Sequence, residues 1–326
     1  MHKRLLEILA CPKCKGELML SAPNDFADDV VDGELSCRSC GAVYPITNGI
    51  ARFVPQDNYA ASFGYQWNRF RKEQIDSYNG TNLSGERFWT ETGWNRDELA
   101  GRWILDAGCG AGRFLDAAAV SNANLVGVDI SSAIDAAKDN LAGRPNVHFV
   151  QASLYELPFR EGAFDHCYCI GVIQHTPDTS ASLRSIAKMV RPGGSLAVTI
   201  YPRKPWTKLF SKYWFRPVTK RLRKETLLRI IEGVMPVAFP ITDVLFRLPV
   251  VGRVFMFAIP VANYVHENRL SRDQRYAWAV LDTFDMLSPY YDQPMTEAEA
   301  ATALEQADIL VRPGAGNGVN LIGEKG

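Results

Sequence analysis

The chain has 326 residues, and its 36 Lys and Arg balance 36 Asp and Glu, so the formal net charge at pH 7 is zero. Hydrophobic residues make up 47% of the chain, enough for a sizeable core in about two domains. The balance of charge excludes a globally basic nucleic-acid-binding protein, although it leaves room for a local basic patch. Residues 1–14 contain no long apolar run, so we expect no signal peptide and a cytoplasmic protein.

Two Cys-x-x-Cys pairs near the N-terminus predict a metal site. Cys11 and Cys14 form the first pair, and Cys37 and Cys40 form the second, with 22 residues between the pairs. Two residues between thiolates let both sulfurs reach one ion, and two such turns complete a closed tetrahedral Zn²⁺ site. The βαβ context of a redox Cys-x-x-Cys is missing. We therefore expect a structural zinc ion held by all four cysteines.

The residues around these cysteines, LLEILACPKCKGEL at 5–18 and VYPITNGI at 43–50, resemble a small zinc-ribbon family. Members of that family act as activating subunits of several methyltransferases. The resemblance covers about residues 3–55 and implies that this part stabilises the chain or binds a partner. A module of this size buries little surface alone, so we expect the metal to supply much of its folding free energy.

The stretch ILDAGCGAGR at 104–113 carries the most specific signal of the chain. An apolar strand ends in Asp106 and is followed by three alternate glycines, which let a backbone turn lie close against a ligand. A second strand ends in Asp129, where a carboxylate would reach a ribose diol. The stretch contains neither G-x-G-x-x-G nor G-K-[ST], which disfavours a dinucleotide or a triphosphate.

These features resemble motifs I and II of class I S-adenosylmethionine (SAM) methyltransferases. The later segments alternate between strands and helices, as in that family, which implies a mainly parallel sheet with right-handed crossovers. We therefore expect an α/β protein: a Rossmann-like, seven-stranded methyltransferase sheet with a large insertion after strand five, plus a small N-terminal zinc ribbon. The expected elements are helices over 131–142, 181–190 and 296–306, strands over 147–150, 164–175 and 195–201, and a final antiparallel pair over 309–311 and 318–323.

The expected domain organisation follows from these elements. The domains are a zinc ribbon over 1–56, an aromatic-rich helical segment or linker over 57–100, a SAM-binding core over 101–201, a lid or substrate insertion over 202–294, and a last helix and two strands of the core over 295–326.

The resemblance implies a SAM site at the carboxyl ends of the strands. Ser153 stands where the family usually has an acid, so its adenine contact would depend on a hydroxyl group. Arg113 reaches either the methionine carboxylate of SAM or only solvent. The residues expected to bind the cofactor are Asp106, Gly108, Gly110, Gly112, Arg113, Asp129, Ile130, Ser153, Leu154, Gly171 and Gln66.

His175 is the best candidate for a catalytic acid or base, because it follows the fourth strand on the side where an acceptor would enter. A histidine near its reference pKa accepts a proton from a hydroxyl or an amine at pH 7. The alternative is that His175 caps a turn. Many methyl transfers need no base, because the sulfonium is already a strong electrophile and positioning supplies most of the rate.

The insertion at 202–294 is far longer than its connection requires, so we expect it to select the substrate. Basic and aromatic residues alternate in its first part, and 233–265 is strongly apolar but interrupted by four prolines, which argues against a membrane-spanning helix. This composition suits a peripheral membrane segment, a buried lid or an oligomer contact, and the basic part equally suits RNA. The candidate acceptor contacts are Tyr290, Tyr291 and Asp285.

The leading interpretation is a SAM-dependent methyltransferase that acts on a small-molecule acceptor, either lipid-linked or saccharide, in the cytoplasm with or without peripheral membrane contact. One alternative is an rRNA or tRNA methyltransferase that grips RNA with the zinc ribbon and the basic stripe. The other is a non-catalytic partner module with the same fold. Each of these interpretations allows the protein to form a homo-oligomer.

Overall fold

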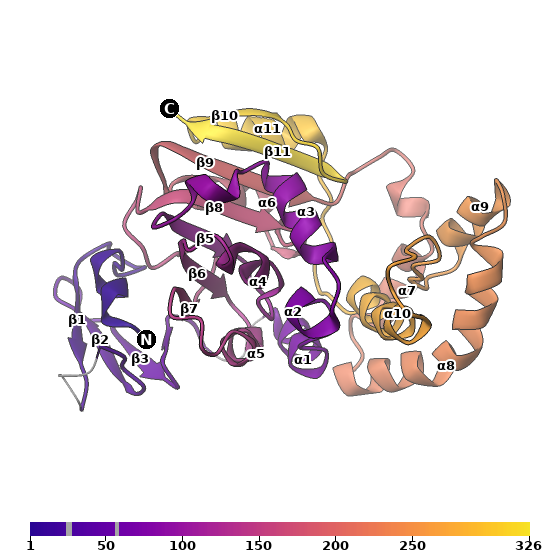
Figure 1. The fold of residues 1–326 in the computed structure, drawn as a ribbon, viewed down its shortest axis with the longest axis horizontal. Coiled ribbons are helices and arrows are strands. Elements are labelled where there is room, and N and C mark those ends of the chain that lie inside the picture. The colour runs from indigo at the N-terminus through magenta and orange to yellow at the C-terminus, as the bar shows by residue number, and fades with distance from the viewer. Residues whose placement is uncertain (24–27, 56–58) are drawn as a thin grey trace.

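The computed structural model describes residues 1–23, 28–55 and 59–326 (Figure 1). The expected boundary between 56 and 57 lies outside the described residues. Within them, eleven strands form one sheet in the order β1-β2-β3-β4-β7-β6-β5-β8-β9-β11-β10. The strands are β1 (Leu18–Ser21), β2 (Gly33–Cys37), β3 (Val43–Thr47), β4 (Ile50–Arg52), β5 (Trp103–Ala107), β6 (Asn124–Asp129), β7 (Val147–Gln151), β8 (Phe164–Ile170), β9 (Val190–Ile200), β10 (Ile309–Pro313) and β11 (Val319–Lys325).

The strands from β7 to β10 in this order are the seven strands of the expected methyltransferase sheet. β7, β6, β5, β8 and β9 are parallel, and β11 returns antiparallel between β9 and β10. The zinc ribbon adds four strands, because β4 pairs in parallel with β7 through Ala51 and Val150. The fold class is confirmed, but the expected count of seven strands is wrong for the sheet as a whole: the ribbon extends it at one edge.

Both faces of the sheet are buried, which explains why its central strands are nearly continuous apolar runs. Leu105 and Ala107 of β5 pack with α6 and α11 on one face, whereas Ile104 packs with α3, α4 and α5 on the other. The ribbon belongs to the first of these clusters, with Leu35 and Ile46 among its fully buried side chains. The ribbon and the sheet therefore share one hydrophobic core.

The helices lie mostly where the sequence predicts them. They are α1 (Ala61–Arg69), α2 (Asp76–Asn79), α3 (Leu83–Thr92), α4 (Arg113–Ala119), α5 (Ala133–Asn140), α6 (Thr179–Ala187), α7 (Lys212–Thr219), α8 (Lys224–Leu245), α9 (Val251–Ala258), α10 (Arg272–Leu287) and α11 (Glu297–Glu305), with short 3₁₀ turns η1 (Lys3–Glu7), η2 (Arg96–Glu98), η3 (Ile173–His175) and η4 (Thr207–Leu209). Thr296 caps α11 through a capping box with Glu299.

Several boundaries differ from the expectation. The strand expected over 164–175 ends at Ile170, and Ile173–His175 form the 3₁₀ turn η3 instead. The helix expected over 181–190 begins at Thr179, because the Asp178 side chain accepts a hydrogen bond from the Ala181 N–H, and it ends at Ala187. The next strand begins at Val190 and passes through Pro192-Gly193-Gly194, where the pairing with β8 shifts register. Gly193 has a φ of +69°, which suits a residue without a Cβ.

The insertion forms a separate helical layer at the opposite end of the molecule from the ribbon (Figure 1). One apolar stripe of α8 packs against α10, around Phe239 and Phe284. Pro236 and Pro240 lie inside the 22-residue α8, which curves but continues (Figure 1), so these two prolines do not interrupt the region as expected. Pro249 and Pro260 do lie in the breaks on either side of α9. Among the described helices, none combines the length and the apolar character needed to cross a bilayer.

Candidate functional site

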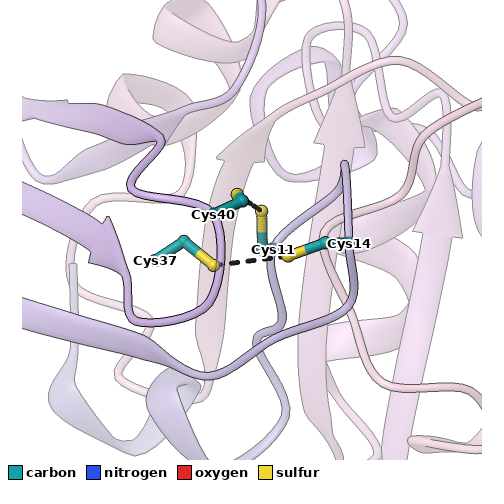
Figure 2. Close-up of side chains that lie close together, drawn as sticks. All are labelled: Cys11, Cys14, Cys37 and Cys40. Carbon is teal, nitrogen blue, oxygen red and sulfur yellow. Dashed lines mark hydrogen bonds between the residues drawn. The ribbon is translucent and has the colours of Figure 1, made fainter.

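The four predicted zinc ligands come together within the ribbon (Figure 2). Their sulfurs all lie within 4.8 Å of one another, with Cys11 and Cys40 3.7 Å apart and Cys14 and Cys37 3.4 Å apart. A tetrahedron with Zn–S bonds of about 2.3 Å has edges of about 3.8 Å. The residues therefore fit one Zn²⁺ ion in a closed site.

A cavity of about 950 Å³ lies at the carboxyl ends of the central strands. Its floor is the loop that follows β5, together with Gly171 after β8 and Ile130 after β6. α3 supplies Arg87 to its wall, and α10 of the insertion supplies Asp282. A volume of this size suits a cofactor and a small substrate side by side.

The loop after β5 requires glycines because neighbouring side chains leave no room for a Cβ atom. Gly108 has a φ of +94°, and a Cβ there would lie 2.5 Å from a methyl carbon of Val172. A Cβ on Gly110 would lie 3.2 Å from the indole nitrogen of Trp67. Both glycines line the cavity. Gly112 precedes α4 with a φ of +89° and lies against Leu141 instead, so its role is in packing.

Asp129 links the ends of the first two core strands. Its Oδ2 accepts a hydrogen bond from the Gly110 N–H at 3.0 Å, and its Oδ1 accepts from the Ser131 N–H at 2.8 Å and the Ser131 hydroxyl at 2.7 Å. The carboxylate lines the cavity, where its oxygens retain lone pairs for a diol. Burial raises the pKa of Asp129 above its ordinary value.

Two other predicted cofactor residues are buried polar groups without complete partners. Oδ2 of Asp106 and both amide atoms of Gln66 make no hydrogen bond to the described residues. Burial, with Asp129 nearby, raises the pKa of Asp106 to about 8. Buried polar atoms are rarely left unpaired. Neither Asp106 nor Gln66 is among the residues that line the cavity, however, so the structure does not bring these two predicted cofactor residues into contact with it.

The predicted adenine loop offers mainly apolar contact. Leu154 and Ile130 line the cavity. The Ser153 hydroxyl accepts a hydrogen bond from the Tyr155 N–H at 3.2 Å and so closes a local turn. The structure thus uses Ser153 to shape the loop that carries Leu154.

Three arginines line the cavity, Arg87, Arg113 and Arg269, and the sequence predicted only Arg113. Arg113 is held by the Ser84 hydroxyl and the Gln74 side-chain oxygen, both at 2.8 Å, and burial lowers its pKa to about 10, which leaves it charged at neutral pH. Arg87 pairs with Glu91 of the same helix at 2.8 Å, and its Nη2 approaches Gly171. The sequence offered one indication for Arg87: it lies in the helical segment that precedes the first core strand.

His175 lies in the wall of the cavity between the rings of Phe63 and Tyr201, with ring centroids 5.0 and 5.6 Å away. Its Nδ1 lies 3.1 Å from the Tyr291 carbonyl oxygen, which makes Nδ1 the protonated nitrogen and leaves Nε2 as an acceptor. Burial lowers the pKa of His175 below its ordinary value, so the ring is neutral at pH 7. These are the properties of a general base.

The three predicted acceptor residues are split between two hollows. Asp285 lines the main cavity together with Asp282, whose pKa burial and the nearby Asp285 raise to about 7. Tyr290 and Tyr291 line a second hollow of about 390 Å³ beside Lys220. The two tyrosines follow the end of α10, and the ring of Tyr291 packs against Tyr59, which lines the main cavity.

Comparisons with known proteins agree with this geometry. Residues 105–198 match the family model described as a methyltransferase domain, and residues 2–49 match the model of Trm112p-like proteins. The chain therefore contains a SAM-dependent methyltransferase domain preceded by a Trm112p-like domain.

The individual relatives align with only part of the chain. A ubiquinone biosynthesis O-methyltransferase of Marinobacter nauticus is 33% identical over 36% of this chain and 51% of its own length. The O-methyltransferase resE of Aspergillus sclerotiorum is 33% identical over 39% of this chain and 50% of its own. The chain thus spans about half the length of the curated relatives it matches. A solved complex of the Haloferax volcanii Trm112 methyltransferase activator is 15% identical, covers 77% of both chains and has a TM-score of 0.42.

Proposed function

We propose that this protein transfers the methyl group of SAM to an oxygen atom of a small-molecule acceptor with an apolar body. The observation that carries the proposal is the single cavity that joins the glycine loop after β5 to His175 and to α10 of the insertion. The relatives named O-methyltransferases support oxygen as the acceptor atom.

One end of the cavity is suited to SAM. Asp129 would accept hydrogen bonds from the ribose diol, and the apolar side chains of Ile130 and Leu154 would contact the adenine. Arg87 and Arg113 place positive charge where the methionine carboxylate of SAM would lie. When bound, SAM supplies a methyl group activated by the positive sulfur.

The other end is suited to an acceptor hydroxyl. Nε2 of the neutral His175 would take the hydroxyl proton as the oxygen attacks, while the Tyr291 carbonyl holds the ring in the required tautomer. Asp282 and Asp285 offer polar contacts on the facing helix, and Phe63 and Met286 offer apolar ones. An apolar molecule with one or a few hydroxyl groups, such as a lipid-linked phenol, fits this lining better than a sugar chain does.

The ribbon supports the cofactor end within the same chain. Arg52 of β4 forms an ion pair with Asp135 of α5 at 2.6 Å and donates a hydrogen bond to the Gln151 side chain at 2.8 Å. Gln151 in turn donates to the Ile130 carbonyl at 3.1 Å. We infer that the Trm112p-like domain stabilises the SAM site of the same chain, and that zinc stabilises the Trm112p-like domain.

The test has two arms. Isothermal titration of the full chain with SAM should show one site, and tritiated SAM should label hydroxylated apolar small molecules in preference to glycans or RNA. A chain that binds no SAM would be a non-catalytic module and would overturn the proposal. Label that appears in RNA alone would replace the acceptor with RNA.

A further inference from the structure

The insertion presents an apolar outer surface that no described part of the chain covers. α8 has a second apolar stripe opposite the one that packs on α10, and each of its side chains is at least half exposed. The stripe is Ile230, Val234, Val237, Ile241 and Val244. The spacing of four, three, four and three residues places them on one side of the helix. A helix that is apolar on both sides is typical of a helix whose second side is covered by another protein surface or by lipid.

The neighbouring helices extend this surface. On α7, Trp214 is 66% exposed and Val218 is 65% exposed, and at the start of α9, Val250 is 86% and Val254 is 62% exposed. α7 and α9 adjoin, because the Ser211 N–H donates to the Phe257 carbonyl at 3.1 Å. We call these exposed side chains of α7, α8 and α9 the apolar surface of the insertion.

Positive charge surrounds this surface. Residues 202–260 contain twelve Lys and Arg but only three Asp and Glu, in a chain whose overall charge is zero. Two of the three acids are already paired: Glu232 with Arg69 at 3.6 Å, and Asp243 with Arg275 and with Arg247. Arg229 and Arg253 are exposed directly beside Ile230 and Val254. Four of the twelve bases are also paired: Arg203 with Glu299, Lys212 and Arg216 with Asp292, and Arg247 with Asp243. Eight Lys and Arg of the segment form no ion pair within the described residues, so the region keeps an excess of positive charge.

We propose that the apolar surface of the insertion docks onto a bilayer that contains anionic lipids. Aliphatic side chains would enter the boundary between headgroups and acyl chains, and the surrounding Lys and Arg would attract the lipid phosphates. A second copy of this chain fits less well, because a symmetric contact would bring two strongly positive faces together. RNA would satisfy the charges but would leave the valines and isoleucines of α8 without an apolar partner.

Docking would also place the cavity near the bilayer. α10 packs against the inner stripe of α8 and supplies Trp278, Asp282 and Asp285 to the cavity wall. A lipid-linked acceptor would then reach the cavity from the membrane through the insertion. This consequence rests on the proposed function, whereas the docking itself does not.

The test is flotation of the full chain with vesicles of phosphatidylcholine alone and with 30% phosphatidylglycerol, at low and high salt. We expect binding to the anionic vesicles that weakens as salt rises. The double variant Val237→Glu with Ile241→Glu should reduce binding at least about tenfold, and Arg229→Glu and Arg253→Glu should each reduce it about fivefold or more. Leu310→Glu, at a 75% exposed position on β10, is the matched control and should bind like the wild type.

Three results would overturn the proposal. The first is a wild-type chain that does not float with anionic vesicles at low salt. The second is a dimer that dissociates in the double variant while vesicle binding is absent. The third is RNA binding that competes with vesicles and is unchanged in the double variant. SAM titration of the same variants separates the two proposals, because SAM affinity should be unaffected whether or not docking is lost.

Discussion

The carboxylate of Asp129 accepts a hydrogen bond from the backbone N–H of Gly110 at 3.0 Å. This bond joins the end of β6 to the glycine loop after β5, so one side chain both shapes the loop and faces the cavity. Asp129 also accepts two hydrogen bonds from Ser131, which fix the position of its second oxygen. A diol that binds here meets a carboxylate already held in place.

Replacing Asp129 with alanine should therefore nearly abolish SAM binding. Two hydrogen bonds to a charged group, each worth about 1.5–3 kcal/mol, correspond to a loss of affinity of about a hundredfold or more. Isothermal titration measures it, with the exposed Asp97→Ala as the control of equal charge change. Full retention of affinity in Asp129→Ala would contradict the placement of the ribose.

Arg87→Met should weaken SAM binding about tenfold, because it removes a charge-assisted contact to the cofactor carboxylate. The variant also leaves Glu91 without its partner at 2.8 Å, so its thermal stability is measured alongside. Arg312→Met on β10 changes the same charge at an exposed position that does not line the cavity. If the two variants bind SAM with equal affinity, Arg87 does not contact the cofactor.

His175→Gln should lower kcat by about a hundredfold to ten thousandfold while leaving SAM affinity unchanged. The sign of the pH dependence follows from burial, which lowers the pKa of His175. The neutral, active form then persists as the pH falls below 6.5, and activity declines only when the pH reaches the lowered pKa. A wild-type profile whose acid limb lies at or above pH 6.5, or an active His175→Gln, would show that His175 is no base.

Arg52→Met tests whether the ribbon supports the cofactor site. Loss of the ion pair with Asp135 and of the hydrogen bond to Gln151 frees the strand end that supports Ile130, and we expect SAM affinity to fall severalfold and the melting temperature to drop. Arg38→Met is a matched control on the same ribbon, because Arg38 and Glu17 form an exposed pair that contributes little.

Metal analysis should find one zinc ion per chain. Its removal by a chelator should lower the melting temperature, because the ribbon shares its hydrophobic core with the central sheet. Re-addition of zinc should restore the melting temperature. A purified chain without zinc that melts at the same temperature with and without added metal would refute a structural role for the four cysteines.

Local sequence patterns were sufficient to predict the structural features that depend on residues close together in the chain. The Cys-x-x-Cys spacing predicted the four-sulfur cluster, because the geometry of such a turn is set by residues a few positions apart. The glycine loop and its two acids predicted the methyltransferase fold through their resemblance to that family. The helix expected over 296–306 likewise begins where predicted, directly after its capping residue Thr296. The sequence predicted Asp285 as an acceptor contact but did not separate it from Tyr290 and Tyr291, which line another hollow.

The sequence by itself determined the four-cysteine ribbon and the long insertion through motif spacing and segment length, which are properties of the chain alone. It indicated the parallel methyltransferase sheet through its resemblance to SAM methyltransferase motifs. Only the tertiary structure decided that β4 joins the sheet at β7, that α8 continues through Pro236 and Pro240, and that Arg87 enters the cavity. Each of these depends on packing between segments far apart in the chain, where burial outweighs local preference.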